Sequence, residues 1–262
     1  MRLPYVEELV LFLLPALAVI LTALHHIRIR RGRTPLVRPL RGTAEVDRRL
    51  GEIAEAGRPL HVATGGGRPG TIGVTAETIA SLSIAQRLAE RAARRGGDVV
   101  VTNGDAVAHV ASRGVLRQAY RRAGLAVEYH GSAAQLVAHQ SPIPYAAGVA
   151  QRYASDAIDS SVVVGDYGSE ALLIGEEGAR RRIPQVSGAT SLTALPALTL
   201  STDATLVGEE LFAAEAYFAE GPAPMARLLT QDGLRRVVVL LIVLGIAYQI
   251  ANNWLGLGLP SL

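Results

Sequence analysis

Two long apolar stretches near the ends of the chain constrain its structure more than any other feature. The first runs from Leu9 to Leu24 and the second begins at Val237, and neither contains a charged residue. A helix needs about 20 mostly apolar residues to cross the roughly 30 Å hydrocarbon core of a bilayer. We therefore expect transmembrane helices over residues 5–27 and 237–258. The alternatives are a cleaved signal peptide for the first stretch and a buried core helix for the second.

Arginines flank only the inner end of each apolar stretch. Arg28, Arg30 and Arg31 follow the first stretch, whereas Arg235 and Arg236 directly precede the second. Positively charged flanks tend to stay on the cytoplasmic side of a membrane. The sequence thus predicts a multi-pass protein of the inner (plasma) membrane, with the lipid bilayer as a partner. Residues 28–236 are expected in the cytoplasm and both termini on the opposite side.

The composition excludes several classes of chemistry. The chain contains no cysteine, and all of its 26 Lys+Arg residues are arginines. Disulfides, thiolate catalysis and cysteine-type zinc sites are therefore excluded, as are lysine Schiff bases and phosphate loops that end in Gly-Lys-Ser/Thr. The net charge of +3 and the low aromatic content of 5% give no indication of a nucleic-acid partner.

Between the two apolar stretches, short apolar runs alternate with amphipathic segments. Apolar runs without strict alternation are typical of strands buried on both faces of a parallel sheet. Strands are expected at Leu60–Thr64, Val99–Thr102, Ala126–Tyr129, Ser161–Gly165 and Pro184–Ser187. Helical periodicity predicts helices over 45–56, 75–95, 105–123, 145–158, 169–181 and 207–219.

Several expected helices end in paired arginines before a glycine or a proline, and a strand follows. Cations in the last turn offset the negative end of the helix dipole, and glycine closes a helix in the left-handed conformation. This repeated order is typical of successive βα units. We therefore expect an α/β fold: a mostly parallel, three-layer, Rossmann-like sheet of about five strands, flanked by an N-terminal and a C-terminal transmembrane helix. A basic linker with a short helix (28–57), an α/β domain (58–220) and a second linker (221–236) complete the expected organisation.

A glycine-rich segment directly after the first expected strand is the most suggestive local motif. Gly65, Gly67 and Gly70 satisfy the pattern G-x-G-x-x-G, which can bring backbone N–H groups close to a phosphate. Two features disagree with a dinucleotide fingerprint: the next helix begins only near Thr75, and no acidic residue ends the second strand at the usual distance. A simple Gly-Pro turn is the alternative interpretation.

Other candidate ligand contacts lie where strands are expected to end. In an open α/β sheet, ligands bind beyond the carboxyl ends of the strands. Thr102, Asp105, Asp166 and Ser187 occupy such positions, together with Gly65 and Gly67. Helix N-capping alone accounts for Asp105, whereas Asp166 is the least easily explained in this way and is the first choice for a polar contact. No metal site, cofactor or catalytic set is recognisable, and the bound small molecule, if there is one, is not identified by the sequence.

Four segments carry a resemblance to a known family. They are Arg58–Gly65, Tyr145–Val149, Leu173–Arg181 and Gly208–Tyr217. With them, residues 40–250 or so resemble a family of bacterial membrane-anchored proteins of the Chloroflexi type that is known only as a domain of unknown function. The resemblance implies membrane anchoring and assigns no activity and no catalytic residue.

We expect a non-enzymatic scaffold domain that assembles with copies of itself into a homo-oligomer at the membrane. Two membrane anchors raise the effective concentration of neighbouring copies, so weak lateral contacts suffice. The segment Leu211–Phe218 is an apolar candidate for such contacts, unless it packs on the sheet. The alternative is a domain that binds a small ligand or nucleotide, or a hydrolytic domain, which uses the strand-end loops.

Overall fold

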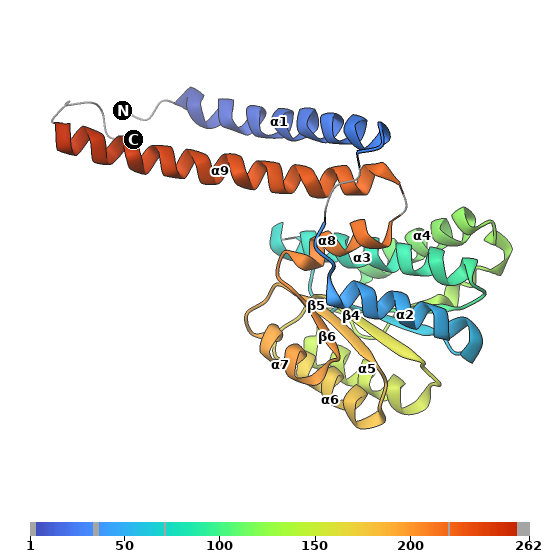
Figure 1. Ribbon diagram of the computed structural model, residues 1–262. Coiled ribbons are helices and arrows are strands. Elements are labelled where there is room, and N and C mark those ends of the chain that lie inside the picture. Colours follow the sequence, from blue (N-terminus) through green and yellow to red (C-terminus); the bar gives the residue numbers. More distant parts are fainter. Residues whose placement is uncertain (1–3, 34–36, 71, 220, 256–262) are drawn as a thin grey trace. The chain divides into compact units, whose positions relative to one another are not determined.

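The computed structural model describes residues 4–33, 37–70, 72–219 and 221–255. The chain divides into two compact units. One unit combines the two ends of the chain, and the other comprises residues 37–219 (Figure 1).

The terminal unit consists of two long helices that lie side by side, α1 (Pro4–Arg30) and α9 (Pro222–Leu255) (Figure 1). Both contain apolar windows long enough to cross a membrane by length and composition, Phe12–Arg30 and Pro222–Trp254. The hydroxyl of Thr22 donates to that of Thr230 over 3.0 Å, which links the two helices through a polar contact. The segment 221–236, expected as a linker, is already helical from Pro222 onward.

The 37–219 unit is built on a six-stranded sheet in which every neighbouring pair is parallel. The strand order is β3-β2-β1-β4-β5-β6, so the expected parallel α/β fold is confirmed. The strands are β1 (Leu60–Gly65), β2 (Val99–Asn103), β3 (Ala134–Leu136), β4 (Ser160–Asp166), β5 (Gln185–Ala189) and β6 (Ala204–Val207). Every residue of β1 and β5 is buried, as expected of central strands that are covered on both faces of a parallel sheet.

Helices cover both faces of the sheet and complete three layers (Figure 1). One face carries α2 (Arg41–Ala56), α3 (Ile72–Arg94), α4 (Ala106–Ala123) and α8 (Glu210–Phe218). The other carries α5 (Pro142–Ser155), α6 (Ala171–Arg181) and α7 (Ala194–Ser201). Each face has its own hydrophobic cluster. The short helix expected within the linker 28–57 is α2, and its apolar side chains Val46, Leu50 and Ile53 are part of the first cluster.

The helix ends follow the expected chemistry. Asp105 caps α4, and Gly124 closes it in the left-handed conformation at φ 82°. Gly57 closes α2 in the same way, whereas α6 ends at Arg182, which itself adopts φ 57°. The arginine-rich helix ends therefore mark true helix boundaries.

Two edge strands and one helix differ from the expectation. Ala126–Glu128, expected within a strand, forms a 3-10 turn, η1, and a second turn, η2, spans Gly131–Ala133 before β3. Val127 is 96% exposed, so this segment lacks the buried face that a strand requires. The strand β6 and the helix α7 were not anticipated. The expected strand Pro184–Ser187 begins at Gln185 and continues to Ala189.

The apolar segment Leu211–Phe218 lies within α8, and one face of this helix points into the core whereas Phe212 is exposed. Leu211 and Ala214 are fully buried, and Phe218 is nearly so. They belong to the cluster that α8 shares with α2 and α3. This face of α8 therefore packs on the sheet, which was the alternative for this segment, and is not available for contacts between copies.

Candidate functional site

The order of the strands reverses direction between β1 and β4. From β1 the chain first adds β2 and β3 on one side, and then crosses to add β4, β5 and β6 on the other. Loops diverge at such a point, and ligands of open α/β sheets bind there, beyond the carboxyl ends of the strands. The loop after β1 contains the glycine-rich motif, and Asp166 ends β4 beside it.

Glycine is required where this loop meets Asp166. Gly65 has φ 89°, and a Cβ atom placed on it would lie 2.5 Å from the backbone oxygen of Asp166. A Cβ on Gly67 would collide with the Asp166 carboxylate itself. A side chain at Gly65 would therefore push β1 and β4 apart, and one at Gly67 would displace the loop or the Asp166 side chain. Gly65, Gly67 and Asp166, three of the residues predicted from the sequence, thus come together.

The loop after β1 is also fixed by its neighbours. The Gly104 N–H donates to the Gly65 carbonyl over 3.0 Å, and the Gly65 N–H donates to the Tyr145 hydroxyl over 3.3 Å. A Cβ on Gly104 would lie only 2.5 Å from the Cα atom of Gly66. The loop therefore packs backbone against backbone over the switch point, as an ordered turn.

Two carboxyl groups, the buried Glu77 and the partly buried Asp166, lie at the switch point. Glu77 on α3 is only 5% exposed. Its Oε1 accepts a hydrogen bond from the Thr190 hydroxyl, and its Oε2 has no hydrogen-bond partner among the described residues. Burial, followed by the charge of Asp166, raises the pKa of Glu77 to about 7. Burial, followed by the charge of Glu170, also raises the pKa of Asp166.

This electrostatic pattern disfavours a phosphate at the switch point, because carboxylates repel anions. It favours a cationic ligand or a neutral hydrogen-bond donor. Within the described ranges, no three His, Asp or Glu side chains are arranged to hold a metal ion. The sequence pattern did not single out Glu77, because a glutamate near the start of an amphipathic helix is ordinarily an exposed polar residue.

The other three predicted residues have structural contacts. Asp105 Oδ1 accepts from the N–H groups of Val107 and Ala108, as an N-cap does. The hydroxyl of Ser187 bonds to those of Thr202 and Thr205, over 2.8 and 3.0 Å. The carbonyl of Thr102 accepts from the Tyr145 hydroxyl over 3.1 Å and from the Thr64 hydroxyl over 3.0 Å, so Thr102 adjoins the end of β1 through structural contacts.

A buried polar network runs beneath the switch point. The ring nitrogens of His61 lie 2.9 Å from the Ser161 hydroxyl and 3.0 Å from the Thr102 hydroxyl. The Tyr153 hydroxyl lies 2.7 Å from that of Ser161. Burial, with a smaller contribution from the charge of Arg152, lowers the pKa of His61 to about 3. His61 is therefore neutral near pH 7 and connects three strands as a structural residue.

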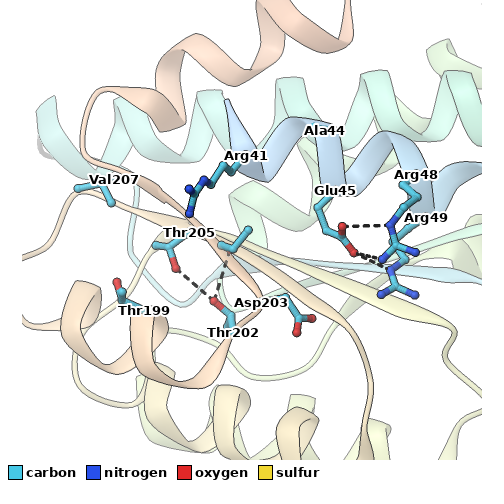
Figure 2. A pocket seen from close by; sticks show the side chains of 11 residues that line it. Arg41, Ala44, Glu45, Arg48, Arg49, Thr199, Thr202, Asp203, Thr205 and Val207 are labelled. Carbon is cyan, nitrogen blue, oxygen red and sulfur yellow. Dashed lines mark hydrogen bonds and ion pairs between the residues drawn. The ribbon is translucent and has the colours of Figure 1, made fainter. Parts of the chain in front are cut away.

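An open cavity lies apart from the switch point, along the edge strand β6 (Figure 2). This groove has a volume of about 840 Å³, and we call it the edge groove. Side chains from α2, from the end of α7 and from β6 with the residues before it form its walls. The lining residues are Arg41, Ala44, Glu45, Arg48, Arg49, Thr199, Thr202, Asp203, Ala204, Thr205 and Val207.

Comparison with known proteins identifies the family and no activity. No curated protein and no solved structure matches the chain. One family model, described as Domain of unknown function (DUF6754), matches residues 4–257 and so covers both terminal helices as well as the α/β unit. The chain therefore belongs to the family DUF6754, a domain of unknown function.

Proposed function

We propose that this protein is a membrane-anchored α/β scaffold domain that assembles with copies of itself. Two helices long enough to span a bilayer, α1 and α9, flank the α/β domain in the sequence. Confinement to a membrane raises the effective concentration of neighbouring copies, so that contacts too weak for association in free solution become sufficient.

The proposed location of the α/β domain is the cytoplasm. Arg28 and Arg30 lie in the last turn of α1, and Arg235 and Arg236 precede the most apolar part of α9. The chain has no cysteine, so single cysteines report topology without interference. We expect Ser132→Cys to resist an impermeant thiol reagent in intact cells and Ser261→Cys to react. Reaction at position 132 without reaction at 261 would reverse the orientation.

The observation that supports self-assembly best is an apolar rim at the carboxyl edge of the sheet. Ile72 opens α3, and Leu192 lies between β5 and α7; they are 92% and 86% exposed. Val107, Ile143 and Leu172 are also exposed, in the first turns of α4, α5 and α6. First turns of helices ordinarily favour polar and acidic residues. Single exposed apolar residues are common, but their recurrence along one edge is typical of an interaction surface.

We assign this rim to contacts with a second copy of the chain. Copies held in the same bilayer meet repeatedly in restricted orientations, and an apolar rim then supplies affinity without a specific pocket. A stable contact of this kind buries at least about 1,000 Å² in total.

Removal of rim side chains is expected to reduce self-association. In the full-length protein in mild detergent, Val107→Ser combined with Ile143→Ser should raise the dissociation constant at least tenfold, about 1.4 kcal/mol. The matched control combines Val127→Ser and Leu200→Ser. These side chains are 96% and 87% exposed, but they lie after α4 and at the end of α7, at the amino edge of the sheet. Equal effects of the two pairs on particle mass in light scattering would contradict the rim as the interface.

A second candidate function is binding of a small cationic or hydrogen-bond-donating ligand at the switch point. It is favoured by the buried Oε2 atom of Glu77, which has no hydrogen-bond partner in the described part of the chain. A ligand that donates to this oxygen should protect the protein against thermal unfolding, and Glu77→Ala should abolish that protection. Screening of amines and neutral donors by thermal shift separates this function from the scaffold, which requires no ligand.

A further inference from the structure

We infer that the edge groove is a second self-association surface, in which the β6 strands of two copies pair antiparallel across a two-fold axis. This inference rests on the proposed self-assembly and adds a contact distinct from the apolar rim. Three features along β6 support it: the open edge of the strand, the shape of the groove and the charges at its two ends.

The strand β6 ends the sheet without protection. It pairs with β5, and no other described strand pairs with its outer edge. Proteins usually shield such an edge with charged residues, a proline or a bulge, because its free N–H and C=O groups recruit another strand. The residues of β6, Ala204 to Val207, include neither a charge nor a proline.

The groove leaves room for the arriving strand. It runs along the outer edge of β6, between α2 on one face of the sheet and the end of α7 on the other. Its volume of about 840 Å³ is sufficient for a short extended segment. Extended segments bind such edges by adding a strand, and main-chain hydrogen bonds then provide much of the affinity.

The charges at the two ends of the groove select a second copy as the occupant. Arg41 begins α2 beside the carboxyl end of β6, since a Cβ on the adjacent Gly42 would lie 3.0 Å from the Leu206 side chain. Figure 2 shows its side chain extending toward the strand. Arg41 is exposed, and its side chain has no ion pair or hydrogen bond among the described residues. Asp203 precedes the amino end of β6 and is also exposed.

The other charges of the groove are already neutralised within the chain. Arg48 and Arg49 both pair with Glu45 and Glu52 on α2. Within the part of the chain that the structure describes, the Asp203 carboxylate accepts only the Gln185 N–H, over 2.8 Å, through one of its two oxygens. Among the described residues that line the groove, one cation without a partner, Arg41, and one available carboxylate, Asp203, therefore remain at opposite ends of β6.

A two-fold axis brings these opposite charges together. When two β6 strands pair antiparallel, the carboxyl end of one lies beside the amino end of the other. Arg41 of each copy then approaches Asp203 of the second copy, which gives two symmetric ion pairs. An isologous contact of this type closes on itself as a dimer. Together with the apolar rim, it provides two distinct contacts per copy, which is what an extended array requires.

A charge exchange in the full-length protein tests this pairing. Arg41→Glu and Asp203→Arg, each alone, should raise the dissociation constant at least tenfold, because like charges then face each other. The double variant should restore it to within about threefold of the wild type. Arg121→Glu, on the exposed face of α4, is the matched control and should change little.

Cross-linking gives an independent measurement in case a charge variant folds poorly. Because the chain contains no cysteine, Thr205→Cys should form a covalent dimer with a short bis-maleimide in mild-detergent extracts. The Asp203→Arg variant in the same background should lose this dimer. If the wild type oligomerises but the exchange restores nothing and Thr205→Cys fails to cross-link, the inferred contact is overturned and self-assembly through the rim stands. A monomeric wild type overturns both.

Discussion

Gly65→Ala is expected to destabilise the 37–219 unit by about 3 kcal/mol or more. Two costs combine at this position. An alanine must adopt φ 89°, a left-handed conformation that disfavours a Cβ atom, and its Cβ would lie 2.5 Å from the backbone oxygen of Asp166. Because this neighbour is backbone, relief requires β1 and β4 to separate, which disrupts the centre of the sheet. Thermal or denaturant unfolding followed by circular dichroism measures the loss.

Gly73→Ala is the matched control for Gly65→Ala. Gly73 lies in the first turn of α3, where an added Cβ would meet no atom within 4 Å. Alanine there reduces the entropy of the unfolded chain and should be neutral or stabilising by up to about 1 kcal/mol. Similar midpoints for Gly65→Ala and the wild type would show that the loop after β1 does not pack on Asp166 as described.

Glu77→Gln is expected to stabilise the protein at pH 8 by up to about 3 kcal/mol. The pKa of Glu77 is raised from 4.5 to about 7 in the folded state, and one pKa unit corresponds to about 1.36 kcal/mol. Between these two values the folded protein binds more protons than the unfolded chain, so its stability falls as the pH rises. The cost is absent below about pH 4.5, grows as the pH rises to about 7, and stays constant above. Glutamine removes it and keeps an oxygen for Thr190.

The difference between the unfolding free energies of Glu77→Gln and the wild type, measured from pH 4.5 to 8, isolates this residue from other titrating groups. The difference should increase with pH and level off above pH 7. Glu176→Gln, at an exposed position of α6, should give a difference that does not vary with pH. A flat profile for Glu77→Gln would mean that Glu77 is solvated or paired, and would remove the main support for a ligand at the switch point.

The centre of the sheet could be predicted from the sequence, and its edges could not. The strands β2 and β4 contain runs of three valines, and β1 and β5 are short segments with an apolar residue between turn residues, which the pattern identifies. The strands β3 and β6 have only three and four residues, and such segments are too short for a period to emerge. Their structure depends on pairing with a neighbour that is distant in sequence.

The same distinction applies to the sites. Gly65, Gly67 and Asp166 were identifiable because parallel topology places the carboxyl ends of strands together. The burial of Glu77 depends on how the start of α3 packs near Thr190, and no periodicity contains that information. The edge groove was equally inaccessible, because it depends on β6 being the outermost strand. For Asp105, the sequence left two interpretations open, and its contacts with Val107 and Ala108 identify the N-cap.

The particle mass of the full-length protein after mild-detergent extraction tests self-assembly most directly. Size-exclusion chromatography with multi-angle light scattering, corrected for bound detergent, gives the number of copies of the 27.6 kDa chain per particle. The account predicts two or more copies, with a mass that decreases on dilution and decreases further when Val107→Ser and Ile143→Ser are combined. A single copy per particle in several mild detergents and over a wide range of protein concentration would contradict it.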